Sequence, residues 1–177
     1  MNKNSEMQLD FEIDKLTKSI ENVISGESFL TEIIRIESKD SRILRKSDWS
    51  FDWKKELKDS ENLIFKLNTV ENPNVIQGLI SLTDKGDHIF MNLIESAKFN
   101  KGKNKLYSGV AGNLVAFGCK FAFENNYDGV VSFIAKTNLI SHYEKTLGAK
   151  IFAGNRMFID TNEAKILVKQ YFKDFKL

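Results

Sequence analysis

Two glycines open a long apolar segment in the stretch 105-KLYSGVAGNLVAFGCKFAFENN-126, and this combination could bind phosphate groups. Because glycine has no Cβ atom, Gly109 and Gly112 would let a phosphate approach the backbone closely. If a helix begins here, its first amides are unpaired and lie at the positive end of the helix dipole, which favours anions. Three lysines just upstream also favour a polyanionic ligand: Lys101, Lys103 and Lys105. The pattern indicates a diphosphate held mainly by main-chain amides; a turn and tight helix packing are the alternative use of the glycines.

The composition predicts an ordinary globular protein with a single domain over residues 1–177. Hydrophobic residues make up 42% of the chain, which is enough for a sizeable core. Residues 1–28 form an N-terminal extension of uncertain structure, in which alternating Leu9, Phe11 and Ile13 suggest a short strand and residues 14–27 form either a hairpin arm or a short helix. With 26 basic and 24 acidic residues, the formal net charge is +2, which argues against a nucleic-acid partner.

Cysteine and histidine usage argues against a metal site or a disulfide. The single cysteine, Cys119, lies in the apolar segment and is interpreted as a buried apolar residue. His88 and His142 are far apart, so no zinc-like pairing is present. The first residues are too polar for a signal peptide and no run reaches membrane-spanning length, so we expect a cytoplasmic protein without membrane contact.

Hydrophobic periodicity predicts a mixed order of strands and helices. Strands are expected at residues 29–36, 61–70, 74–83, 87–96 and 129–136, followed by a hairpin of residues 150–153 and 156–160. Helices are expected in two pieces within residues 38–59, over the apolar segment that begins at Val110, and at residues 139–147 and 163–172. Thr137 or Asn138 could cap the 139–147 helix, and Gly148 would end it.

The links between these elements predict the sheet topology. Short turn sequences, ENPN and DKGD, join the strands between residues 61 and 96, which indicates an antiparallel meander. A helical crossover joins the 87–96 and 129–136 strands, so these two should be parallel neighbours. The fold class is therefore α+β of a three-layer α/β/α type, with a mixed and mostly antiparallel central sheet.

The order of elements over residues 29–160 resembles the GCN5-related N-acetyltransferase family. In that family the pyrophosphate loop reads Arg/Gln-x-x-Gly-x-Gly/Ala; here 106-LYSGVA-111 matches at Gly109 and Ala111, while Leu106 stands at the basic or amide position. The family's Tyr-Glu-Lys-x-Gly-Phe resembles 143-YEKTLGA-149, with one extra residue. The family's asparagine seven residues before that tyrosine is replaced by Lys136.

This resemblance implies a V-shaped splay between the two parallel strands, with acetyl-CoA in the cleft. The pantetheine amides would pair with the backbone of residues 93–96, and the diphosphate would lie on the amides of residues 107–113. Asn138 would contact the cofactor near the thiol, with a helix cap as its alternative role. The implied cofactor-binding residues are Leu93, Ile94, Glu95, Ser96, Tyr107, Ser108, Gly109, Val110, Ala111, Gly112, Asn113, Lys136 and Asn138.

The family's reaction, in which an amine attacks the thioester and the thiolate leaves, needs a base and an acid. Tyr143 matches the family's tyrosine and is the candidate acid; a half-buried tyrosine with a satisfied hydroxyl is the alternative. Glu95 is the candidate base, with burial expected to raise its pKa, or else an ordinary edge carboxylate. His142 should point about 100° away from Tyr143 around the helix and is left out.

The expected function is acetyl-CoA-dependent N-acyl transfer to a small-molecule or peptide amine, without a metal. A non-catalytic acyl-CoA-binding or protein-interaction module on the same fold is the alternative, and Leu106 and Lys136 favour it. The resemblance implies that residues 38–59 and 150–160 form the acceptor surface, where Trp49, Phe51 and Trp53 line a pocket or belong to the core. The sequence selects no particular acceptor and leaves oligomerisation open.

Overall fold

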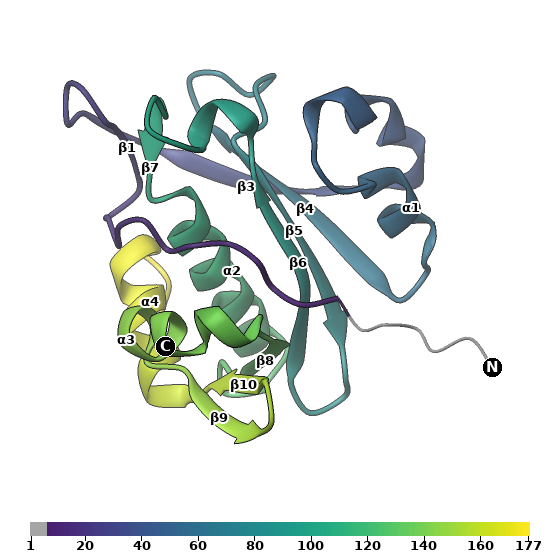
Figure 1. Ribbon diagram of the computed structural model, residues 1–177, viewed down its shortest axis with the longest axis vertical. Coiled ribbons are helices and arrows are strands. Elements are labelled where there is room, and N and C mark those ends of the chain that lie inside the picture. The colour runs from purple at the N-terminus through teal and green to yellow at the C-terminus, as the bar shows by residue number, and fades with distance from the viewer. Residues whose placement is uncertain (1–6) are drawn as a thin grey trace.

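The computed structural model describes residues 7–177 and arranges them around a seven-stranded sheet (Figure 1). The strand order is β3-β4-β5-β6-β8-β10-β9. These strands are β3 (Thr31–Ile36), β4 (Asn62–Thr69), β5 (Gly78–Asp84), β6 (Ile89–Ser96), β8 (Val131–Ile134), β9 (Lys150–Ala153) and β10 (Arg156–Ile159). Helix α1 (Trp53–Lys58) covers one face, while α2 (Val110–Glu124), α3 (Ile140–Leu147) and α4 (Thr161–Tyr171) lie on the other side of the sheet. The predicted three-layer α/β/α class is confirmed.

The pairing of the strands agrees with the predicted topology. β3 to β6 form an antiparallel meander, and β6 and β8 are parallel neighbours. The parallel pairing joins Ile89 to Val131 and Phe90 to Ser132 and does not extend to the carboxyl ends of the strands. A register shift against β5, where Leu93 faces Ser81 and Met91 faces Leu82, marks a β-bulge in β6 at Asn92. Because a bulge bends its strand, β6 turns away from β8 here and the predicted splay opens.

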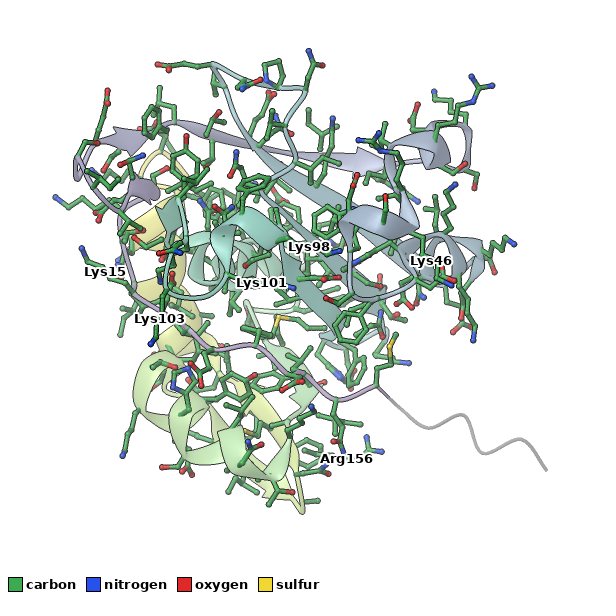
Figure 2. All side chains as sticks on the ribbon, turned by 45° about the horizontal axis from the view of Figure 1, so that its top comes forward. Lys15, Lys46, Lys98, Lys101, Lys103 and Arg156 are labelled. Carbon is green, nitrogen blue, oxygen red and sulfur yellow. The ribbon has the colours of Figure 1, made fainter. Side chains whose placement is uncertain are left out.

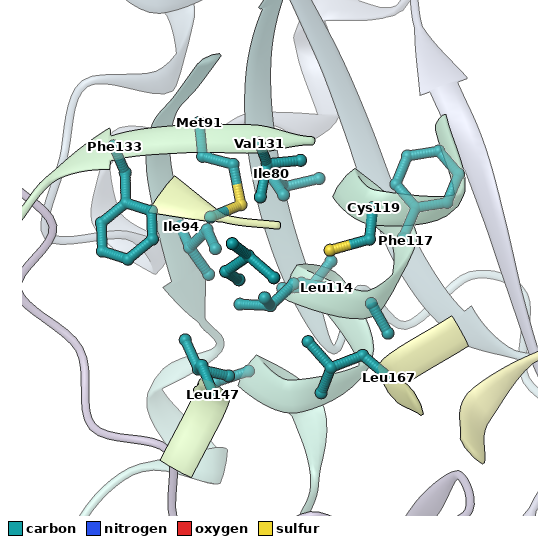
Figure 3. Close-up of a cluster of buried hydrophobic side chains, with 14 of the residues drawn as sticks. Ile80, Met91, Ile94, Leu114, Phe117, Cys119, Val131, Phe133, Leu147 and Leu167 are labelled. Atoms are coloured by element: carbon teal, nitrogen blue, oxygen red, sulfur yellow. The ribbon is translucent and has the colours of Figure 1, made fainter. Parts of the chain in front are cut away.

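Helix α2 packs against the sheet because its sequence is apolar on nearly every side (Figure 3). Leu114 and Cys119 contribute to a buried cluster with side chains of β5, β6 and β8, closed by Leu147 of α3 and Leu167 of α4. Gly78 of β5 allows this close approach, because a Cβ there would lie 2.8 Å from Val110 and 2.9 Å from Leu114. Burial raises the pKa of Cys119 to about 12, in keeping with the predicted structural role.

Two regions differ from the prediction. Residues 38–48 form two 3₁₀ helices, Ser38–Ile43 and Lys46–Asp48, so the only α-helix described within 38–59 is the six-residue α1. A second sheet of order β2-β1-β7 was not predicted: β1 (Ile20–Asn22) and β2 (Ser28–Phe29) form a hairpin, and β7 (Tyr107–Ser108) pairs with β1. Strands of two or three residues are too short to show an alternating pattern. Within residues 7–177, no helix is long and apolar enough to cross a membrane.

A buried polar network lies on the sheet face beneath α1. The Glu56 carboxylate of α1 accepts hydrogen bonds from Ser81 Oγ at 2.7 Å and from Asn62 Nδ2 at 3.0 Å. The bulge residue Asn92 donates to Thr83 Oγ1 at 2.8 Å and to Ser81 Oγ at 3.2 Å. Burial is the main cause that raises the pKa of Glu56, with only partial compensation from Ser81. The charged form of Glu56 is therefore disfavoured in the folded protein.

Replacing Glu56 with glutamine is expected to stabilise the protein at neutral pH, on the order of 1 kcal/mol, because the buried charge is removed. The raised pKa means that Glu56 stabilises the fold below its unfolded value of 4.5 and loses this contribution as pH rises through the folded pKa. The gain in unfolding free energy of Glu56→Gln should therefore shrink as pH falls below that value. Urea unfolding of both proteins at pH 7.5 and pH 4 checks this, and a loss of stability at pH 7.5 would contradict it.

Candidate active site

A cavity of about 530 Å³ lies beside the carboxyl end of β6, beyond the residues that pair with β8. One wall is the carboxyl end of β6, from Ile94 to Ser96, and the floor includes Val110 and Ala111 at the start of α2. The N-terminal segment forms the opposite wall, and the lysine-rich loop after β6 closes one side. The full lining is Asp10, Phe11, Glu12, Asp14, Phe51, Ile94, Glu95, Ser96, Asn100, Lys101, Gly102, Lys103, Lys105, Val110 and Ala111. The structure thus brings five predicted cofactor residues to one cavity: Ile94, Glu95, Ser96, Val110 and Ala111.

At the start of α2, the chain itself fills the space that the missing Cβ atoms of both glycines leave; a Cβ at Gly109 would collide with the Thr17 hydroxyl and lie 2.7 Å from Ser19 O. Gly109 precedes the helix with φ of 85°, a left-handed conformation that favours glycine. Its N–H donates to Asp14 Oδ1 at 3.3 Å, so a carboxylate of the chain itself lies at this anion-binding position. Gly112 was expected to serve ligand approach, and this expectation is wrong. A Cβ there would collide with the Tyr171 hydroxyl and lie 3.0 Å from Leu16, so Gly112 permits close packing of the chain.

The other predicted phosphate-loop residues lie away from the cavity lining. Tyr107 and Ser108 form β7 and pair with β1, so they belong to a small sheet instead of an open loop. Asn113 is buried and donates to Thr31 Oγ1 at 3.2 Å, which ties α2 to β3. Leu93 packs in the core beneath α1. The part of the predicted diphosphate site that borders the cavity is therefore the first helical turn, not the whole of residues 107–113.

Glu95 is an anchoring carboxylate in this structure. Its side chain accepts hydrogen bonds from Ser50 N at 2.7 Å, Phe51 N at 3.3 Å and Trp53 Nε1 at 2.8 Å. Lys101 Nζ lies 2.9 Å from Oε1, the oxygen that also accepts from Ser50 N, and forms an ion pair. Burial alone would raise the pKa of Glu95, but the hydrogen bonds and the Lys101 charge outweigh it and hold the pKa below the usual range. The expected rise in pKa was wrong, because burial brought four hydrogen-bond donors with it.

Tyr143, on the first turn of α3, is fully buried and is not among the described residues that line the cavity, although its partner Phe11 is. Its hydroxyl donates to Phe11 O at 2.7 Å and accepts from Phe11 N at 3.3 Å. One residue of the N-terminal segment therefore engages the hydroxyl both as a donor and as an acceptor. Burial raises the pKa of Tyr143 above its ordinary range, which keeps the hydroxyl protonated at neutral pH. His142, which the sequence argument left out, contacts the same segment: Ile13 N donates to His142 Nε2 at 2.8 Å.

Lys136 and Asn138 lie in the loop after β8. Lys136 forms an ion pair with Asp10 of the N-terminal segment, and its backbone N–H donates to Leu9 O at 3.2 Å. A 3₁₀ turn, Thr137–Leu139, precedes α3, and neither Thr137 nor Asn138 caps that helix with a side-chain hydrogen bond. The predicted cap is therefore wrong. Gly148 does end α3 in the left-handed conformation, as predicted.

Three lysines of the loop after β6 line the cavity, and they differ in whether they have an ion-pair partner; Lys101 and Lys103 are labelled in Figure 2. Lys101 is paired with Glu95, and Lys105 Nζ lies 2.7 Å from Asp14 Oδ2. Lys103 lines the cavity and has no ion-pair partner among residues 7–177. Within that same part of the chain, no three histidine, cysteine or acidic side chains are grouped to hold a metal ion.

Asn100 is a polar residue of the cavity that the sequence argument did not single out. It is 6% exposed, and its Nδ2 donates to Gln77 Oε1 at 2.9 Å and to Gln77 O at 3.2 Å. Its Oδ1 is buried without a hydrogen-bond partner among the described residues. Buried acceptors are normally satisfied, so this amide oxygen is suited to a donor group of a ligand. Its position within 98-KFNKGKNK-105 was the available signal, but the lysines dominate that pattern.

Solved acetyltransferase structures have a similar fold. A structure of AtaTR bound with acetyl-CoA aligns with a TM-score of 0.55 and 14% identity, covering 77% of this chain and 97% of that chain. An AtaT–AtaR complex bound to DNA gives a TM-score of 0.56 and 16% identity over 77% and 98% of the two chains. A dodecameric spermidine N-acetyltransferase from Vibrio cholerae gives 0.50 and 15% identity over 82% and 98%.

These likenesses show the fold, which is that of the GCN5-related N-acetyltransferases expected from the element order. At 14–16% identity they do not extend to the acceptor or to individual side chains. No family model and no curated protein matches the sequence.

Proposed function

We propose that this protein is an acetyl-CoA-dependent N-acyltransferase that acetylates an amine. The observation that carries the proposal is the cavity between the carboxyl end of β6 and the N-terminal segment, which is also lined by the first turn of a 15-residue helix and by three lysines. This arrangement joins an extended backbone edge, suited to the amides of a pantetheine arm, to a positive terminus suited to a diphosphate. The shared fold with a protein solved in complex with acetyl-CoA supports the same cofactor.

Particular residues are assigned to parts of this reaction. Asn100 Oδ1 would accept a hydrogen bond from a ligand amide, while Lys103 and Lys105 would face the phosphates. The amine nitrogen would attack the thioester carbonyl carbon, and the carbon–sulfur bond would break with the electron pair leaving on sulfur. Tyr143 would donate its hydroxyl proton to that thiolate, while the proton lost by the amine nitrogen would pass to solvent water, from which the Tyr143 hydroxyl would be restored. We assign Glu95 to anchoring the 50–53 loop and Lys101 at the cavity wall, in place of the role of a base.

The second candidate is an acyl-CoA-binding or protein-interaction module without turnover. The contact of Phe11 with both functions of the Tyr143 hydroxyl favours it, because the proposed acid is engaged in the state described here. Leu106 at the basic position of the loop also favours it, since it is 49% exposed and offers no hydrogen bond to a phosphate. The two candidates share a cofactor site and differ in whether a thiol is released.

The acceptor is proposed only by class, as a primary amine of a small molecule or peptide. Spermidine is the substrate named for one protein of similar fold, which makes polyamines a first group to test. The same protein is a dodecamer and another similar protein was solved on DNA, so an oligomer and a nucleic-acid contact are further proposals for measurement. The formal charge of +2 gives the DNA contact no support of its own.

Acetyl-CoA at about 100 times its Kd is expected to stabilise the fold by about 2.7 kcal/mol by mass action. For a chain of this length, that corresponds to a rise in Tm of roughly 5–10 °C. Differential scanning fluorimetry measures the shift, and a thiol reagent then follows coenzyme A release with a panel of polyamines, amino acids and peptides. Matched titration with adenosine serves as the control. No shift with acetyl-CoA would contradict the cofactor assignment, whereas a shift without thiol release on any amine would favour the binding module.

A further inference from the structure

The N-terminal segment, residues 9–17, runs along the route that the proposed cofactor would take (Figure 1). Leu9 forms a parallel bridge with Ala135: its N–H donates to Ile134 O at 2.6 Å, and its carbonyl accepts from Lys136 N at 3.2 Å. This is the edge of β8 that becomes available where β6 turns away. An extended backbone of the chain itself therefore fills one side of the splay, and its next residues form a wall of the cavity.

Asp14 places an anion at the start of α2. Its Oδ1 accepts from Gly109 N at 3.3 Å and its Oδ2 lies 2.7 Å from Lys105 Nζ. A phosphate group would use the same donors, because helix N-termini and lysines bind carboxylates and phosphates alike. A ligand diphosphate and the Asp14 carboxylate cannot both hold these two groups. The contact therefore blocks one end of the proposed cofactor site.

The middle of the segment is bound by α3, and its far end by α4. The Tyr143 hydroxyl donates a hydrogen bond to Phe11 O, and Ile13 N donates one to His142 Nε2. Thr17 N donates to the Tyr171 hydroxyl at 3.0 Å, and Thr17 O accepts from Gln170 Nε2 at 2.8 Å. Apart from the Leu9 bridge, the segment does not pair with a strand in a β-ladder, and the hydrogen bonds of Phe11, Ile13 and Thr17 go to side chains of α3 and α4. Opening of the segment leaves the strands of the central sheet paired but exposes the buried side chains of Leu9 and Ile13, so the closed state is the main one in the free protein.

We propose that residues 9–17 are an autoinhibitory strap that competes with the cofactor for the start of α2 and for Tyr143. This inference rests on the proposed function, because it assigns regulation to the same site. In the closed state Asp14 takes the place of the diphosphate, and the backbone of Phe11 forms both hydrogen bonds of the Tyr143 hydroxyl, the proposed acid. Acetyl-CoA binds the open state, so its apparent affinity is lowered by the fraction of molecules that are open. Release of the strap frees the Tyr143 hydroxyl at the moment that the cofactor arrives.

Asp14→Asn should tighten coenzyme A binding by roughly threefold to tenfold, because the charge-assisted contacts of the closed state are weakened. Glu12→Gln is the matched control: it removes the same charge from the same segment and the same cavity, and no hydrogen bond joins Glu12 to α2 among the described residues. Calorimetric titration with coenzyme A gives the affinities. Hydrogen exchange then reports the strap directly, and coenzyme A should speed exchange of the backbone amides of residues 11–17 in the unmodified protein.

The affinities for coenzyme A and the hydrogen exchange of residues 11–17 together distinguish a strap from a fixed wall of the site. Equal affinity for the unmodified protein and Asp14→Asn, with residues 11–17 protected by coenzyme A, would show that the segment is a fixed wall of the site and would overturn the strap alone. An equal gain in Glu12→Gln would reduce the effect to general electrostatics and would also overturn it. Failure of the unmodified protein and of Asp14→Asn alike to bind coenzyme A would overturn the strap together with the proposed function. Binding by Asp14→Asn only would support both.

Discussion

Replacing Tyr143 with phenylalanine is expected to lower turnover about 100-fold or more, the size typical for loss of a general acid or base. The side chain is fully buried and the change deletes one oxygen, so the fold should be kept. Burial raises the pKa of Tyr143, which keeps the hydroxyl protonated at neutral pH and able to donate a hydrogen bond to the leaving thiolate. The measurement is the steady-state rate of coenzyme A release with the best amine found.

The same variant separates an acid from a structural hydroxyl. Tyr143→Phe also removes the group that holds Phe11, so the strap should loosen and the KM for acetyl-CoA should fall or stay constant while kcat falls. Tyr127→Phe is the control, because it removes a hydroxyl that donates to Asp84 at 2.8 Å outside the residues that line the cavity. Turnover that is unchanged in Tyr143→Phe would remove this residue from the mechanism.

Local signals in the sequence were sufficient for the antiparallel run of β4, β5 and β6 and for the parallel pair of β6 and β8, but not for the places of β3 and β10 in the sheet. The turn sequences ENPN and DKGD fixed the meander, and the long apolar run from Val110 predicted a helix buried on most sides. The same reasoning failed for residues 38–48, where 3₁₀ turns replace the expected helix. Serines and aspartates in this stretch offer the backbone alternative hydrogen bonds, and helical spacing of Trp49 and Trp53 reflects packing in the core beneath α1.

The site was less predictable, because its contacts join residues that are far apart in the chain. Gly109 was recognised from the glycine loop, yet its partner Asp14 lies 95 positions away. The Phe11 contact of Tyr143 spans 132 positions. The alternating Leu9, Phe11 and Ile13 indicated an extended segment, but not which strand edge it would meet. Burial of Glu95 was foreseen, whereas the donors that reverse its effect on the pKa come from another element.

Replacing Glu95 with glutamine is expected to destabilise the protein by about 2–4 kcal/mol, because several donors converge on a side chain that is 1% exposed. A carboxylate accepts from Ser50, Phe51 and Trp53 together with Lys101, but a carboxamide directs its own N–H groups at one of these donors. Against a typical total of about 5–15 kcal/mol, this is a large loss. Urea unfolding monitored by tryptophan fluorescence measures it.

The pH dependence distinguishes an anchor from a base. Because hydrogen bonds and Lys101 hold the pKa of Glu95 low in spite of burial, its stabilisation is present above the unfolded value of 4.5 and is lost as pH falls through the folded pKa. The deficit of Glu95→Gln should therefore be full at pH 7.5 and shrink in acid. Glu56→Gln is the matched comparison, a second buried glutamate near the same strands whose pKa is raised, and its effect has the opposite sign. If Glu95→Gln kept full stability at pH 7.5 and lost only turnover, Glu95 would be the base after all.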